Sequence, residues 1–402
     1  MRKQIQPVAA PSAAMKRWGI VLLVGCAAVT RLVGQQSGIP ITVSETAGIR
    51  RTAYPVSAQV EIPEHSLSDV GHVRLRRNGA DVPAQFRAAT TWPDGSVRAL
   101  DVDFNASIGP RETLSYSLEA GAAVTAPAVP RGLSVVDSGE SIQVGNVTFG
   151  KTASPLLRSV KYRDEDIVEG PNGFSVIDAS GASHDVVLSS PAASIIKPGP
   201  LDVALRYAGE AAIGSARPLP FVITAEMPSS KTWIKMSLSV QDPDQRVRAI
   251  VFRNTLSLGP SPILWDFGTS KGTYGVFRSA TETATFSRER SASASLYAWH
   301  VDAAAGGRPE QVLESDSEPI RPLWGHLQGS KEAVAFAADF SQGADGVQTL
   351  RLNGAGQITI QSAPRMPLRN PSLTVYEHFV SAPVQIGAAT SPAAILAPLA
   401  VR

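Results

Sequence analysis

Apolar and polar residues alternate between two turn sequences near the start of the chain. Asn78-Gly79 suits a two-residue hairpin turn, because both residues tolerate a positive φ. Pro93-Asp94-Gly95 supplies a second turn, in which proline fixes φ and glycine adopts the left-handed region. Over residues 82–88, and again over 100–104, every second residue is apolar. This period of two predicts a β-meander with one face toward solvent.

Asp101 and Asp103 fall on the polar side of the second of these segments. Two carboxylates on one strand face could serve acid–base chemistry. Charged residues also keep the outward face of a small sheet soluble, and this simpler role fits the pattern better.

The same alternation recurs many times after residue 140. It is clearest from Trp233 to Val240, where the apolar residues from Ile234 to Val240 occupy every second position. Other short segments with strand character are 141–149, 156–162, 175–178, 185–188, 201–207, 221–227, 247–258, 274–278, 295–301, 333–340, 348–352, 357–360 and 373–380. So many strands in about 270 residues predict a large antiparallel β-sandwich.

The chain as a whole is expected to be all-β. Gly and Pro are plentiful, and no long segment has a helical period, so we expect less than about a tenth of the residues in helices, well below the globular norm. A spacer rich in Ala, Pro and Val, from Gly121 to Pro130, separates the two series of strands. We therefore expect a small N-terminal domain at residues 45–122 and a large β-sandwich domain at residues 131–400.

Residues 1–37 have the character of a targeting segment. A basic leader precedes an apolar run, from Trp18 to Val24, that is too short to span a bilayer. Cys26 is the only cysteine of the chain and follows Leu23-Val24-Gly25, a sequence that resembles a bacterial lipobox, so lipidation at Cys26 is one alternative. An ordinary signal peptide and a single N-terminal anchor are the others. In each case we expect an exported protein, periplasmic or at the cell surface.

Charge and cysteine content narrow the function classes. Arg2, Lys3, Lys16, Arg17 and Arg31 lie in the leader, which leaves 32 of the 37 basic residues against 35 acidic ones, a net charge of −3. A nearly neutral chain without a basic stripe gives no reason to expect nucleic-acid binding. Without further cysteines there is no disulfide or thiolate metal site, so stability must come from core burial.

Part of the N-terminal region resembles a known family. The segments Tyr54 to Pro63, Val82 to Phe86, Trp92 to Arg98 and Thr113 to Gly121 occur in the order found in the N-terminal RIFT-barrel domain of the exo-rhamnogalacturonan lyase and YetA-like family. Residues 199–207 and 233–240 resemble, more weakly, the central β-sandwich of that family. The resemblance implies a RIFT-type barrel at residues 45–122 followed by the sandwich.

The resemblance also bears on activity. Lyases of this family carry a large C-terminal (α/α) toroid that forms one wall of the active-site cleft, and no helical region of that kind follows the sandwich here. It therefore implies a protein related to polysaccharide-lyase accessory domains, with a polysaccharide as the expected ligand and without a cofactor.

Lyase chemistry on a uronate would require a base and a cation to neutralise the carboxylate. Tyr376 and His378 are two residues apart on an expected strand, so both side chains point to one face. With Arg365 as the cation, they are the candidate catalytic residues; a half-buried sheet face explains the pair as well. Lys331 is a further candidate base or cation, and no metal site is expected.

Candidate sugar-binding residues are aromatic residues next to histidines. Trp324 and His326 lie in an expected loop between Pro322 and Gly329, and Trp299 and His300 lie on an expected strand. Sugars stack on exposed rings, but such residues also pack in cores.

Three hypotheses about function remain. The first is an exported, non-catalytic glycan-binding or cell-envelope protein. The second is a divergent polysaccharide lyase or other glycan-active enzyme that uses the sandwich face, and the third is a purely structural envelope protein. Loss of the toroid favours the first and third. Exposed aromatic residues on one face would separate them.

Overall fold

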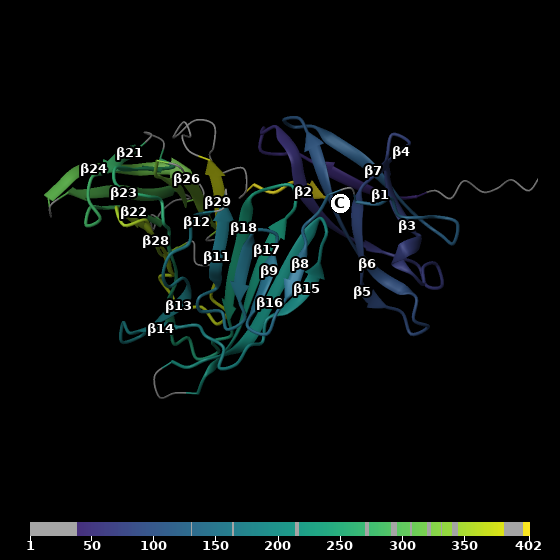
Figure 1. Cartoon of the computed structure of the whole chain (residues 1–402), viewed down its shortest axis with the longest axis horizontal. Coiled ribbons are helices and arrows are strands. Elements are labelled where there is room, and N and C mark those ends of the chain that lie inside the picture. The colour runs from purple at the N-terminus through teal and green to yellow at the C-terminus, as the bar shows by residue number, and fades with distance from the viewer. Residues whose placement is uncertain are drawn as a thin grey trace, which may run out of the picture. The chain divides into compact units, whose positions relative to one another are not determined.

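The computed structural model describes residues 38–402 except 130, 163–164, 214–216, 270–272, 291–295, 306–307, 320–322, 331, 340–344 and 382–396. In these residues every strand pair is antiparallel, and the one helical element is a short 3-10 turn, Val70–His72 (Figure 1). The expected all-β fold is thus confirmed. No helix of the described chain has the length and apolar character to cross a membrane.

Two small sheets make up the N-terminal region. The three-stranded sheet has the order β2-β6-β5, with bounds Arg51–Glu61, Val97–Ile108 and Ala84–Thr91. The five-stranded sheet has the order β30-β1-β7-β3-β4, with bounds Ala400–Val401, Ile39–Ser44, Thr113–Ala120, Val73–Arg77 and Ala80–Val82.

Both expected turns form, but the expected meander is divided. Asn78 and Gly79 have φ of 50° and 80° between β3 and β4, and Gly95 has φ of 87° between β5 and β6. Strand β4 pairs with β3 in one sheet, whereas β5 pairs with β6 in the other. The strands part at Pro83, which has no N–H to donate to a continuous ladder.

Three larger sheets follow. An eight-stranded sheet has the order β14-β13-β19-β28-β27-β22-β23-β24, with bounds Ser183–Asp185, Gly173–Asp178, Val247–Thr255, Gln357–Ala363, Val347–Asn353, Thr283–Arg290, Leu296–Ala305 and Arg308–Pro319. A nine-stranded sheet has the order β15-β16-β17-β18-β29-β26-β25-β20-β21, with bounds Ser194–Pro198, Asp202–Ala211, Leu219–Pro228, Trp233–Val240, Ser372–Ser381, Glu332–Asp339, Leu323–Gln328, Ile263–Phe267 and Thr273–Phe277. A further sheet has the order β12-β11-β10-β9-β8, with bounds Glu165–Asp166, Leu157–Tyr162, Val147–Gly150, Ser141–Val144 and Val135–Asp137.

These three sheets share one hydrophobic core. On β18 the alternate residues Ile234, Met236 and Leu238 are fully buried in it, and on β19 Ile250 and Phe252 meet them from the eight-stranded sheet. A residue and its neighbour on a strand point to opposite faces, so the remaining side chains of both sheets point away from this core. The large region is therefore a β-sandwich with two outer faces.

The C-terminal strand pairs with the N-terminal region and not with the sandwich. Val401 and Ala400 on β30 pair with Val43 and Ser44 on β1, and Leu399 is buried in the N-terminal core. In Figure 1 the C-terminus lies among the N-terminal strands. The second domain was expected to end at residue 400, whereas Ala400 and Val401 pair with a strand of the N-terminal sheet. The domain boundary at 121–130 stays a prediction.

A carboxyl group lies inside the sandwich core. The Glu377 side chain is fully buried on β29, and Nδ2 of Asn254, on β19 of the facing sheet, donates to both of its oxygens at 2.9 Å. Burial raises the pKa of Glu377 to about 7, and the Asn254 hydrogen bond opposes that rise only in part. Glu377 is thus protonated in mildly acidic solution and begins to ionise, inside the core, near neutral pH.

We expect Glu377→Gln to stabilise the protein at pH 8 and to change little at pH 4. A group whose pKa is raised in the folded state contributes stability below its unfolded pKa, and this stability is lost as the pH rises through the folded value. The wild type should lose on the order of 3 kcal/mol of unfolding free energy between pH 4.5 and 7 through this residue. Denaturant unfolding at both pH values measures it, with the exposed Glu61→Gln as control. Equal pH dependence of wild type and Glu377→Gln would contradict the assignment.

Candidate functional site

Strand register brings two pairs of candidate residues together on the outer face of the nine-stranded sheet. His326 on β25 lies opposite Ala335 on β26, and Ala335 lies opposite His378 on β29. In the next row of this face, Trp324 and Tyr376 lie on either side of Ala337. The two alanines have short side chains, so an imidazole and an aromatic ring stand on each side of β26.

His326 lies in the strand interior, not in a loop. The expected loop was wrong because residues 323–328 form β25 between two paired strands. The imidazole is 2% exposed, and its Nδ1 lies 2.6 Å from Oδ1 of Asp266 on β20. Trp324 meets His326 edge to face with ring centroids 5.4 Å apart. His326 therefore holds its position through a buried carboxylate and a neighbouring ring.

His378 and Tyr376 are both uncharged at neutral pH. Burial, with the nearby charges of Lys231 and His326, lowers the pKa of His378 to about 4. Burial, with Asp339 and Glu226, raises the pKa of Tyr376 to about 12. A base as weak as His378, beside a phenol this hard to ionise, suits hydrogen bonding better than proton abstraction from a carbon acid.

The structure places the other candidates elsewhere. Arg365 is half exposed and pairs with Glu289 on β22, at 2.8 Å. Trp299 is 5% exposed and packs edge to face on Phe286 in the sandwich core, so its ring does not offer an open stacking surface. His300 lies 2.7 Å from Asp302 on the same strand, β23. Cys26 and Lys331 lie outside the described residues.

A cavity of about 260 Å³ adjoins Tyr376. Tyr54 on β2 and Trp233 on β18 contribute two more rings, and Trp233 also contacts His378 edge to face at 6.3 Å. The charged lining residues come from β6, β16, β17 and β18: Asp103, Asp202, Glu226 and Lys235. Rings beside paired charges and hydroxyls can hold a small polar ligand with apolar faces.

Lys197 bridges two of the carboxylates that line this cavity. Nζ of Lys197, on β15, donates to Oδ2 of Asp202 at 2.8 Å and to Oδ1 of Asp103 at 3.0 Å. Ser57 on β2 also donates to Oδ1 of Asp103, at 2.5 Å. Burial raises the pKa of Asp202 to about 6; Lys197 opposes this, while Asp103 and Glu226 add to it. Burial alone would lower the pKa of Lys197, but the two aspartates raise it, so the lysine stays charged.

Asp103 and Lys197 were missed by sequence reasoning. Asp103 was expected on a solvated face but is 3% exposed, because that face packs against the start of β16. Its partner lies 94 residues away in the chain. The one available signal was a pair of carboxylates on one strand face, and it does not identify the lysine.

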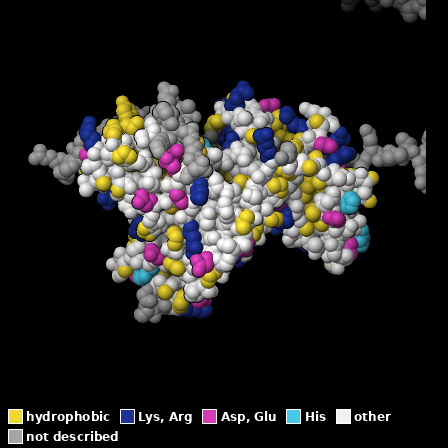
Figure 2. All heavy atoms as spheres, in the orientation of Figure 1, with side chains coloured by type: hydrophobic (Ala, Val, Ile, Leu, Met, Phe, Trp, Pro, Cys, Tyr) yellow, Lys and Arg dark blue, Asp and Glu magenta, His cyan; other side chains and the backbone are white. Residues whose placement is uncertain are grey.

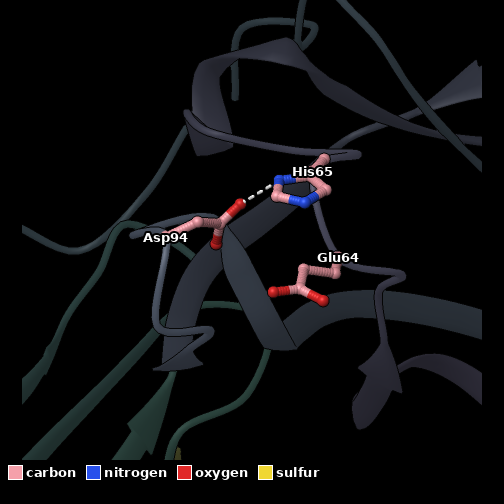
Figure 3. Close-up of side chains that lie close together, drawn as sticks. All are labelled: Glu64, His65 and Asp94. Atoms are coloured by element: carbon pink, nitrogen blue, oxygen red, sulfur yellow. Dashed lines mark ion pairs between the residues drawn. The ribbon is translucent and has the colours of Figure 1, made fainter.

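A second cluster lies in two loops of the N-terminal region. Glu64, His65 and Asp94 have ligand-type atoms within 4.8 Å of one another, and all three residues are exposed (Figure 3). Asp94 pairs with His65 and accepts hydrogen bonds from the backbone and hydroxyl of Ser96 at 2.9 and 2.7 Å. The side chains are compatible with a divalent cation, but these internal contacts explain the cluster without one, and we assign it no ligand.

No protein-family model and no curated protein matches the chain. Two solved structures share its fold: an alpha-mannosidase from Enterococcus faecalis V583, with a TM-score of 0.52 and 12% identity, and a protein of glycosyl hydrolase family 38 from Enterococcus faecalis, with 0.54 and 9%. Each alignment covers 92% of this chain but 46% and 48% of those proteins, so this chain spans about half their length. At such low identity the likeness shows the fold alone. The resemblance to the rhamnogalacturonan lyase family stays a prediction.

We expect Lys197→Met to destabilise the protein by about 3 kcal/mol at pH 7.5, because it leaves two buried carboxylates without their cation. Lys235→Met is the matched control. Its partner Glu226 is about one-third exposed, so that pair should contribute less than about 1 kcal/mol. Urea unfolding of both variants measures the difference. Equal losses would show that the Lys197 bridge is no more important than a surface pair.

Proposed function

We propose that this protein binds a saccharide in the cavity beside Tyr376 and does not transform it. The observation that carries the proposal is one cavity that combines Tyr54, Trp233 and Tyr376 with charged hydrogen-bonding groups. A volume of about 260 Å³ suits one or two sugar units at most. Tyr54 and Trp233 are 8% exposed and pack on each other, so Tyr376 is the ring of this lining most open to the C–H face of a sugar. The carboxylates can accept hydrogen bonds from sugar hydroxyl groups.

The charged residues that line the cavity beside Tyr376 favour a neutral saccharide over a uronate. Three carboxylates line the cavity, and the two nearby lysines are already engaged: Lys197 with two aspartates, and Lys235 with Glu226 at 2.9 Å. A bound uronate would have to compete with these carboxylates for a cation. Lyase chemistry needs such a cation at the substrate carboxylate, so the wall also argues against a lyase.

The fold and the N-terminal segment support a glycan-related role outside the cytoplasm. Two solved structures with this fold are an alpha-mannosidase and a protein of glycosyl hydrolase family 38, which agrees with a glycan-related role. The leader and the resemblance to polysaccharide-lyase accessory domains support an exported protein that meets its glycan outside the cytoplasm. We group this protein with the non-catalytic relatives of polysaccharide lyases.

We expect weak binding of a neutral disaccharide, with mannobiose as the probe and a Kd of about 1 mM. Tyr376→Phe should weaken it about three- to tenfold, the effect of removing one hydrogen-bonding hydroxyl from the cavity wall. Tyr274→Phe is the matched control, because that ring is 70% exposed on β21 and does not line the cavity. Titration followed by tryptophan fluorescence measures all three proteins. Equal affinities, or no binding to the wild type, would refute the proposal.

A second candidate function is glycan hydrolysis, favoured by one observation. Burial raises the pKa of Asp202 to about 6, and Lys197 bridges it to Asp103; two neighbouring carboxyl groups, one with a raised pKa, are what acid–base cleavage of a glycosidic bond uses. Against it, Lys197 occupies both groups.

We expect the purified protein to release no reducing sugar from mannan and no unsaturated uronate from rhamnogalacturonan. The first result tests hydrolysis and the second tests the lyase. Turnover that disappears in Asp202→Asn would establish a hydrolase, and turnover that disappears in Tyr376→Phe or His378→Ala would establish a lyase. Either result would replace the non-catalytic proposal.

A further inference from the structure

A second polar site lies on the outer face of the eight-stranded sheet. Arg253 on β19 and Arg351 on β27 both lie opposite Thr359 on β28, the strand between them. The alternate residues of these strands, such as Phe252, Leu350 and Ile360, are buried in the sandwich core, so this row points outward. Two strand spacings separate the arginine backbones by about 10 Å.

A cavity of about 290 Å³ opens over this row. Its lining consists of Arg253, Arg351, Thr359, Asn353, Gln357 and Leu352. Leu352 is buried toward the core, and the Asn353 amide is engaged in the β27–β28 turn, where it accepts from the backbone N–H groups of Ala355 and Gln357 and donates to Oε1 of Gln357. The groups available to a ligand are therefore two guanidinium groups, the hydroxyl of Thr359 and Nε2 of Gln357. The lining contains no carboxylate.

The two guanidinium groups are held without a carboxylate partner. Nη1 of Arg253 donates to Oγ of Ser175 at 2.9 Å, a neutral contact that fixes the side chain. In the described part of the chain, neither Arg253 nor Arg351 forms an ion pair. Asp302, which lies further along the same row beyond Thr285, is engaged by His300. Two cations facing one cavity therefore lack the anion that would offset their repulsion.

We infer that this cavity binds an acidic saccharide, with the carboxylate of a uronate or a sulfate ester held between Arg253 and Arg351. Guanidinium groups match the planar, two-oxygen geometry of a carboxylate and also bind sulfate oxygens. The hydroxyl of Thr359 and the Nε2 group of Gln357 can hydrogen-bond to sugar hydroxyl groups around the anion. Single-stranded nucleic acid fits less well, since no aromatic ring lines the cavity on which a base could stack.

This site is independent of the proposed neutral-sugar cavity. The two lie on different sheets and share no lining residue. Their charges also differ, with three carboxylates around one and two guanidinium groups around the other. An experiment can therefore refute either binding proposal and leave the other intact.

The test is isothermal titration calorimetry at low ionic strength. The full chain is titrated separately with digalacturonate, galactobiose and sodium sulfate. We expect digalacturonate to bind and galactobiose to bind at least tenfold more weakly. Arg351→Gln should lower the affinity for digalacturonate at least tenfold, and Arg253→Gln should act similarly. Arg248→Gln, an exposed arginine on the same strand as Arg253, should change it less than twofold. Tyr376→Phe should also leave it unchanged, which separates this site from the neutral-sugar cavity.

Several outcomes would overturn the inference. Loss of digalacturonate binding in Arg248→Gln as large as in Arg351→Gln would show a general charge effect. Sulfate binding as tight as digalacturonate binding would show a simple anion site without saccharide recognition. Absence of binding in a wild type whose circular dichroism shows a folded β-protein would remove the site. Retention of full affinity by both Arg351→Gln and Arg253→Gln, with unfolding midpoints like the wild type, would place binding elsewhere.

Discussion

Side-chain alternation along the central strands of the nine-stranded sheet is the constraint on which both core and site depend. On β29 Val375, Glu377 and Phe379 point into the core, so Tyr376 and His378 must point outward. A shift of one residue in the pairing of β29 would exchange the two sets. The apolar rows on β18 and β26 oppose such a shift, because it would expose residues that are now fully buried. The energy that fixes the site is therefore burial on the opposite face of the same sheet.

The Glu377 carboxyl shows how closely that register is specified. Glu377, the polar residue in the inward row of β29, meets the amide of Asn254, which faces it from the eight-stranded sheet. In a register shifted by two residues the carboxyl would still point into the core but would lose this partner, which is costly even for the protonated form. A buried polar pair thus discriminates between registers that hydrophobic residues alone would tolerate.

Sequence reasoning succeeded where the determining interactions are local. The bounds of β18, the turns at Asn78-Gly79 and Gly95, and the all-β class follow from alternation and from residues that tolerate positive φ. It named Tyr376, His378, Trp324 and His326 as candidates, a prediction that stays open, and did not show that Ala335 and Ala337 bring them into one surface. It failed for Asp103, Trp299 and the terminal strand β30, since burial and long-range pairing depend on segments tens to hundreds of residues away. Arg253 and Arg351 were missed for the same reason: 98 positions separate them, and Thr359 on a third strand sets their spacing.

Charged side chains are distributed differently over the two outer faces of the sandwich. The chain after residue 37 is nearly neutral, so its net charge does not select a ligand. Acidic and basic side chains are interspersed on the face of the molecule shown in Figure 2. Selection must then arise locally, where an ion lacks a partner of opposite sign. Beside the cavity at Tyr376, Lys197 and Lys235 are already paired with carboxylates, whereas the guanidinium groups of Arg253 and Arg351 face an open cavity. The two outer faces of the sandwich thus differ in local charge: acidic and basic groups are paired beside one cavity, and two guanidinium groups without a carboxylate partner line the other.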